Sequence, residues 1–119
     1  MQEWKNGGLF SKFLYSANGL HQAFKTEKAI RNETFALISA VAIAIIMKRP
    51  ADKIFYVFCA SLFPIIIELI NTAAERIIDS LLGQIYRQEV KIQKDMLSAA
   101  VFLSLFTGYA ISLKIILFG

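Results

Sequence analysis

Four polar side chains recur at helical spacing along an otherwise apolar stretch: Glu68, Asn71, Glu75 and Asp79. Their separations of three, four and four residues place them on one face of an α-helix. Glu68 directly follows Pro64-Ile65-Ile66-Ile67, so its carboxylate lies at the edge of hydrocarbon, where an unpaired charge is unfavourable. We therefore expect these groups to do chemistry. The alternative is a polar seam that only specifies how helices pair.

The carboxylates on this face repel one another unless a cation joins them. Oxygen ligands without paired histidines or a thiolate cluster suit a hard ion, magnesium before zinc or copper. Magnesium takes one or two carboxylates together with substrate phosphates, which points to a nucleotide. The chain contains neither GxxxxGK[ST] nor GxGxxG, so lysines, helix ends and the metal must hold the phosphates. Lys94 and Asp95 are a candidate pair for this task, although such pairs are common at membrane interfaces.

Three apolar runs supply the elements that must position these groups, and they cover residues 32–47, 54–75 and 97–118. Of the 119 residues, 56% are apolar and 18% are charged, which is more apolar surface than so short a chain can bury. We expect an all-α membrane protein with three transmembrane helices in one domain, residues 1–119.

Two further segments complete the predicted architecture. Residues 9–28 repeat apolar side chains at helical spacing and predict an amphipathic helix. This helix either lies in the membrane interface or packs on its own bundle. The polar residues 79–94 are expected to extend the second transmembrane helix beyond the bilayer and to turn back, with Gly83 as the break. Trp4, Tyr56 and Tyr109 are expected in an aromatic belt or in packing.

The basic residues predict an orientation in the membrane. The chain has 13 Lys and Arg against 9 Asp and Glu, a net charge of +4. These cations flank the apolar runs, which favours a membrane surface and argues against nucleic acid as the anionic neighbour. One side of the predicted bundle holds most of them, namely Lys5, Lys12, Lys25, Lys28, Arg31, Arg76, Arg87, Lys91 and Lys94. The other side holds only Lys48, Arg49, Lys53 and Lys114. The excess predicts a cytoplasmic N-terminus.

Three stretches of the sequence resemble one known family. Residues 68–79, ELINTAAERIID, resemble the E-x-x-N-[ST]-A-x-E-x-x-x-D signature of the bacterial integral-membrane diacylglycerol kinases. Residues 94–100, KDMLSAA, resemble the K-D-M-x-S-A-A motif that opens the third helix of that family. Residues 19–33 resemble its G-L-x-x-A-[WF]-x-x-E-x-x-[FI]-R-x-E segment. The resemblance extends over nearly the whole chain.

The resemblance implies a homotrimer in the bacterial inner membrane that transfers the γ-phosphoryl group of MgATP to diacylglycerol and forms phosphatidic acid. Glu68 matches the general base, and Glu27 and Glu75 match the residues that hold Mg²⁺. The positions that match nucleotide contacts are Tyr15, Glu27, Asn71, Glu75, Lys94 and Asp95. Those that match the lipid side are Arg31, Glu33, Glu68 and Ser98. Phosphoryl transfer mainly needs positioning, charge neutralisation and a base near the nucleophile, which these residue types supply.

The sequence departs from the family pattern between Gly83 and Gln88, where an acid and a histidine are usual. Tyr86 and Arg87 are the candidates to replace them. An arginine that some members place before the amphipathic helix is absent at Gly8, with Lys12 as its possible replacement.

Three other functions remain open from the sequence. Undecaprenol kinases share the fold, metal and base, but Glu33 favours diacylglycerol, because those enzymes tend to carry a histidine one or two positions further on. A small multidrug or proton-coupled transporter needs an acid near mid-bilayer and a fourth span. If the protein were a structural membrane subunit without catalysis, the occurrence of these acids together with Lys94 would be a coincidence.

Overall fold

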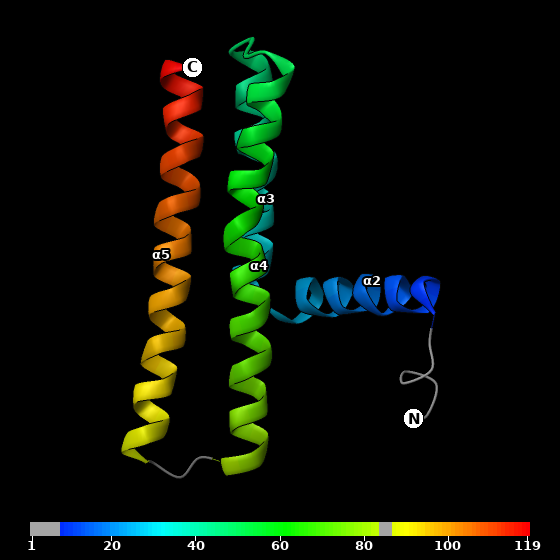
Figure 1. The fold of residues 1–119 in the computed structure, drawn as a ribbon, viewed down its shortest axis with the longest axis vertical. Helices are drawn as coiled ribbons and strands as arrows, with labels where there is room; N and C mark the ends of the chain where they lie inside the picture. The colour runs from blue at the N-terminus through cyan, green and yellow to red at the C-terminus, as the bar shows by residue number, and fades with distance from the viewer. Residues whose placement is uncertain (1–7, 84–86) are drawn as a thin grey trace.

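The computed structural model describes residues 8–83 and 87–119, and this part of the chain is all-α. Its helices are α2 (Leu9–Thr26), α3 (Lys28–Ile46), α4 (Ala51–Leu82) and α5 (Gln88–Phe118). The last three are long and apolar enough to cross a membrane. In Figure 1, α3, α4 and α5 run alongside one another, whereas α2 runs across their common direction. The expectation of three spanning helices and a short N-terminal helix is confirmed.

The change of direction between α2 and α3 occurs at Glu27, whose φ of −118° and ψ of 115° are those of an extended residue. The predicted amphipathic helix 9–28 therefore ends at Thr26. Ala23 is its one buried residue, while Leu9 and Phe10 are 88% and 74% exposed. The helix thus does not pack along its own bundle, and its exposed apolar face suits the membrane interface.

At the far end of the bundle, a short turn joins α3 and α4. Lys48 adopts a positive φ of 60°, and Pro50 caps the start of α4. The guanidinium group of Arg49 donates two hydrogen bonds, of 3.2 and 2.8 Å, to the carbonyl oxygen of Ile116. These bonds satisfy a carbonyl of the last turn of α5 and fix that end of the helix to the turn.

Small residues allow α5 to approach α4 closely. Ser104, Gly108 and Ser112 are spaced four residues apart on α5, and all are buried. The Ser112 and Ser61 hydroxyl groups form a hydrogen bond of 3.0 Å across the interface. A methyl group at Gly108 would overlap the carbonyl oxygen of Ala60 and the ring of Pro64. Small residues and hydroxyl pairs of this kind are usual where helices associate in lipid.

The loop at the polar end begins where the sequence predicts it. Gly83 follows the last residue of α4 and has a φ of +67°. Glycine adopts a positive φ without a steric penalty, so it allows the chain to leave the helix here. Tyr86, one candidate to replace the family's acid and histidine, lies outside the described residues. Arg87, the other candidate, is exposed and directly precedes α5. The predicted spans 54–75 and 97–118 lie within α4 and α5, and the span 32–47 ends one residue beyond α3.

Candidate active site

The polar face of α4 becomes more exposed toward the polar end of the bundle. Glu68 and Asn71 are buried, with 8% and 9% of their surface exposed, whereas Glu75 and Asp79 are half-buried. Asn71 lies within hydrogen-bonding reach of the Glu68 carboxylate. The predicted face of α4 therefore carries one carboxylate inside the apolar part of the bundle and two more toward its polar end.

Glu33 of α3 lies against this face. Its side chain is buried, with 7% of its surface exposed, and it is within hydrogen-bonding reach of Glu68. Arg31, which the resemblance also places on the lipid side, instead donates hydrogen bonds of 2.9 and 3.0 Å to the carbonyl oxygens of Phe24 and Lys25. Arg31 thus caps the C-terminal end of α2. Of these two residues, Glu33 is the one that interacts with Glu68.

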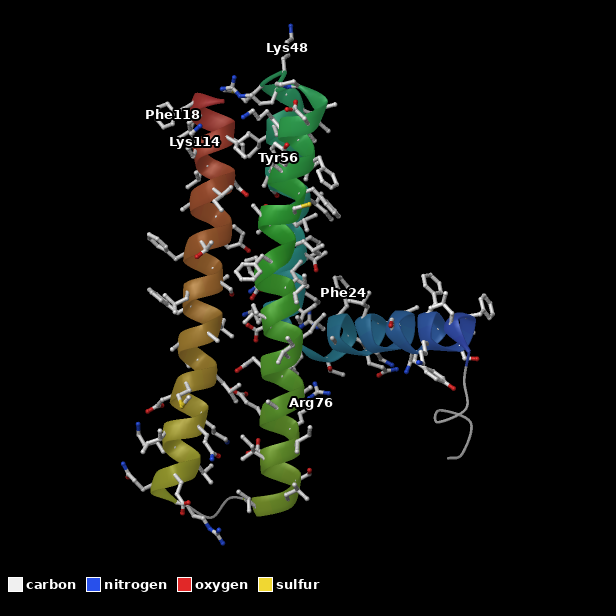
Figure 2. The ribbon with its side chains drawn as sticks, viewed as in Figure 1. Phe24, Lys48, Tyr56, Arg76, Lys114 and Phe118 are labelled. Carbon is white, nitrogen blue, oxygen red and sulfur yellow. The ribbon has the colours of Figure 1, made fainter. Side chains whose placement is uncertain are left out.

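Glu27, at the break between α2 and α3, pairs with Arg76 of α4. The Arg76 guanidinium also donates a hydrogen bond of 2.8 Å to the hydroxyl of Thr26. In Figure 2, Arg76 lies beside the end of α2 where Phe24 is labelled. The sequence alone indicates Arg76 only as a cation for orientation and does not predict this contact with Glu27. Its position directly after Glu75 was the available signal.

The pair Lys94 and Asp95 does not face a common partner. Lys94 donates a hydrogen bond of 2.7 Å to Asp79 of α4, and Lys91 forms an ion pair of 2.7 Å with Asp95. Lys94 precedes the predicted span 97–118, and its hydrogen bond with Asp79 raises the pKa of its ammonium group above the ordinary value. An anion at this end of α5 would therefore meet a charged lysine already held by a carboxylate.

Two other predicted site residues, Tyr15 and Ser98, are exposed in the single chain. Tyr15 is 43% exposed on α2, and Ser98 is exposed on α5. Within the described part of the chain, no hydrogen bond or ion pair joins either residue to Glu68. The Tyr109 hydroxyl, by contrast, is buried. Predicted as a belt or packing residue, Tyr109 lies within electrostatic range of Glu33.

A groove of about 660 Å³ lies in the corner between α2 and α4. Its walls are formed by α2 between Ser16 and Ala23 and by α4 between Leu69 and Arg76. Most of its lining is apolar, and Arg76 places a cation at its wall. A groove of this size and character suits a ligand with an apolar body and a polar head.

The acidic residues fit a magnesium ion held together with a nucleotide. Glu27 and Glu75, from two different parts of the chain, both act electrostatically on Glu68. Among the residues that the structure describes, no three His, Cys, Asp or Glu side chains are grouped closely enough to hold a metal by themselves. Magnesium fits such a site, because it commonly takes one or two carboxylates and completes its coordination with water and phosphate oxygens.

The fold and these residues define a class, that of small helical membrane proteins with a carboxylate site at the border between hydrocarbon and the polar end of the bundle. The family follows from comparison. A model of the family described as prokaryotic diacylglycerol kinase matches residues 14–116. The chain therefore belongs to the prokaryotic diacylglycerol kinase family.

Curated relatives support this membership. The chain is similar to a diacylglycerol kinase of Synechocystis sp., with 32% identity over 96 residues, which are 81% of this chain and 55% of the relative. It therefore spans about half the length of that protein. A Haemophilus influenzae diacylglycerol kinase is 31% identical over 98 residues, covering 82% of this chain and 81% of the relative. An Escherichia coli K12 diacylglycerol kinase is 33% identical over 91 residues, with coverages of 76% and 74%. The names of the family and its members denote kinases, which are phosphotransferases.

Proposed function

We propose that this protein transfers the γ-phosphoryl group of MgATP to the free hydroxyl group of diacylglycerol, forming phosphatidic acid and ADP. The observation that carries the proposal is the buried Glu68 carboxylate on the same helix face as Glu75, which lies nearer the polar end. A lipid hydroxyl can thereby reach a base at the edge of the hydrocarbon region while the nucleotide stays in the aqueous phase.

Glu68 serves as the general base. The lipid hydroxyl oxygen forms a bond to the γ-phosphorus, its proton passes to the Glu68 carboxylate, and the bond from the γ-phosphorus to the bridging oxygen breaks, which releases ADP. Asn71 lies within hydrogen-bonding reach of Glu68 and orients its carboxylate. Burial of both groups excludes water, which would otherwise compete with the lipid for the phosphoryl group.

The nucleotide is proposed to bind at the polar end of α4 and α5. Glu27 and Glu75 would hold Mg²⁺, which neutralises charge on the phosphate oxygens. Lys94 supplies a positive charge near those phosphates, and Asp95 and Tyr15 complete the nucleotide contacts. The electrostatic influence of both Glu27 and Glu75 on Glu68 supports this arrangement.

The lipid side is assigned to Glu33, Arg31 and Ser98 with Glu68. We further propose a homotrimer in the bacterial inner membrane with a cytoplasmic N-terminus. A trimer is supported by the positions of Tyr15 and Ser98, which are exposed in one chain and would reach a site completed by a neighbouring chain. The predicted excess of cations at one end of the bundle supports the orientation.

The test is transfer of labelled γ-phosphate from MgATP to diacylglycerol, and in parallel to undecaprenol, by the purified chain in mixed micelles. We expect labelled phosphatidic acid from the unchanged protein. Glu68→Gln should lower kcat by at least about a hundredfold, the range of a lost general base, while MgATP binding stays intact. Glu89→Gln, the same change at an exposed glutamate of α5, is the matched control.

The other outcomes have definite meanings. Labelling of undecaprenol alone would keep the mechanism and make the protein an undecaprenol kinase. Labelling of neither lipid by folded protein would contradict the kinase proposal. Equal loss of turnover and MgATP binding in Glu68→Gln would assign Glu68 to the metal and not to proton transfer.

A further inference from the structure

Three buried polar atoms in the described part of the chain have no hydrogen-bond partner: Glu33 Oε1, Asn71 Oδ1 and the hydroxyl of Tyr109. They belong to α3, α4 and α5 respectively, so each helix of the bundle contributes one. An unsatisfied polar group in an apolar interior is unfavourable, and native structures contain few of them. Three such atoms, one from each helix of the bundle, indicate a position that a ligand fills.

Two of the three residues interact with Glu68, and the third interacts with Glu33. Glu33 and Asn71 each lie within hydrogen-bonding reach of Glu68, and Tyr109 lies within electrostatic range of Glu33. Glu33 and Asn71 are more than nine-tenths buried. The Tyr109 hydroxyl is buried by its own chain alone, so its burial requires no second copy.

The chemistry of the three atoms differs in one decisive respect. A carboxylate oxygen and an amide oxygen accept hydrogen bonds, whereas the tyrosine hydroxyl also donates one. Among the three, Tyr109 is therefore the donor available to an acceptor oxygen of a ligand. Diacylglycerol carries such oxygens, because its ester carbonyl groups lie next to the hydroxyl that receives the phosphoryl group. A polyprenol carries a hydroxyl but no carbonyl.

We propose that Tyr109 is a specificity-determining residue, whose hydroxyl donates a hydrogen bond to an ester carbonyl oxygen of the acceptor lipid. Glu33 accepts a hydrogen bond from the lipid hydroxyl or from a water beside it, and Glu68 takes the proton during transfer. This inference rests on the proposed lipid kinase function. It assigns to α5 the recognition of the ester group, a role that no sequence motif suggested for Tyr109.

A packing role for Tyr109 predicts something different. If only the ring mattered, phenylalanine would serve equally well and would bury no unsatisfied hydroxyl, so Tyr109→Phe would keep or increase stability without changing substrate preference. A hydroxyl that binds the ester carbonyl makes a difference only with substrates that carry this carbonyl. The choice of substrate therefore separates the two roles.

The experiment compares a diacylglycerol with the dialkylglycerol of the same chain length, in which ether oxygens replace the ester groups and the carbonyls are absent. Values of KM and kcat are measured with both lipids for the unchanged chain and for Tyr109→Phe. Tyr56→Phe removes a hydroxyl from an exposed tyrosine of α4 and is the matched control. Thermal unfolding of each variant in micelles checks that the fold is kept.

We expect Tyr109→Phe to raise the KM for diacylglycerol about fivefold to tenfold, the range of one neutral hydrogen bond, with little change for dialkylglycerol. Tyr56→Phe should change neither value. Equal changes with both lipids, no change with either, or a loss of activity that follows a lower unfolding temperature would overturn the role of Tyr109. Activity of the unchanged chain on both lipids would still uphold the kinase proposal in those cases, whereas its inactivity on both would refute the two together.

Discussion

Arg76 of α4 holds Glu27, the residue at which the chain changes direction between α2 and α3. The same guanidinium group binds the hydroxyl of Thr26, so it contacts both residues at the end of α2. Glu27 is also a proposed magnesium ligand. Arg76 therefore neutralises a carboxylate that a bound Mg²⁺ would have to share or take over.

Replacing Arg76 with glutamine should make the metal easier to bind. Arg76 is 54% exposed and its partner 31%, and exposed ion pairs contribute at most about 1 kcal/mol. Loss of this competitor should lower the Mg²⁺ concentration for half-maximal activity about twofold to fivefold at saturating ATP. A Mg²⁺ titration of the transfer reaction measures this value.

The matched control for that titration is Lys25→Gln, which removes the charge of an exposed lysine in the last turn of α2. It should leave the Mg²⁺ dependence unchanged. A higher requirement for MgATP in Arg76→Gln, with unchanged Mg²⁺ affinity, would show instead that the guanidinium binds phosphate and does not compete with the metal.

Glu75→Gln should weaken metal-dependent nucleotide binding, because an amide oxygen is neutral and Mg²⁺ favours a carboxylate. We expect the KM for MgATP and the half-saturating Mg²⁺ concentration to rise together by at least about tenfold. Glu89→Gln at the exposed start of α5 should change neither value. An unchanged Mg²⁺ dependence in Glu75→Gln would remove Glu75 from the metal site.

The sequence predicts the helices and one face of the site well, because both depend on periodicity within a single segment. Glu68 and Asn71 lie on one face as a consequence of helical spacing alone, and the glycine at Gly83 marks a helix end by its backbone freedom. The extended residue at Glu27 was missed, since no proline or glycine marks the break.

The spacing of residues within one helix does not predict which residues of different helices come into contact. Tyr109 lies on α5, a helix that is apolar on nearly every side, so its sequence pattern gives no sign of which face meets Glu33. The pairing of Lys94 with Asp79 likewise depends on how α4 and α5 lie against each other. The sequence motif pairs Lys94 with Asp95 as candidate nucleotide contacts, and it does not indicate the partner across the helices.

Gly108→Ala should destabilise the bundle. The added methyl group would overlap the carbonyl oxygen of Ala60 and the ring of Pro64, and neither can move without displacing the backbone of α4. Overpacking of this kind costs about 1–3 kcal/mol and should lower the unfolding temperature in micelles. Gly19→Ala is the matched control, because nothing lies within 4 Å of the added atom. Alanine within α2 should be neutral or slightly stabilising. Equal stability of the two variants would contradict the close approach of α4 and α5.

The proposed orientation predicts which lysines a reagent reaches from the cytoplasmic side. Lys91 lies near the start of α5, at the polar end that carries the predicted excess of cations. Lys53 lies in the first turn of α4, close to the turn at Lys48, and Figure 2 shows Lys48 and Lys114 together at that opposite end of the bundle.

An amine-reactive reagent that does not cross membranes is applied to sealed inverted vesicles, whose outer surface is the cytoplasmic face. Lys91 should be labelled and Lys53 protected, and opening the vesicles with detergent should expose both. Lys91→Arg and Lys53→Arg identify the labelled peptides by mass spectrometry, because each keeps the charge and removes the reactive amine. Labelling of Lys53 with protection of Lys91 would reverse the orientation. It would also place Glu75 and Lys94 on the side without cytosolic ATP, which the kinase mechanism could not accommodate.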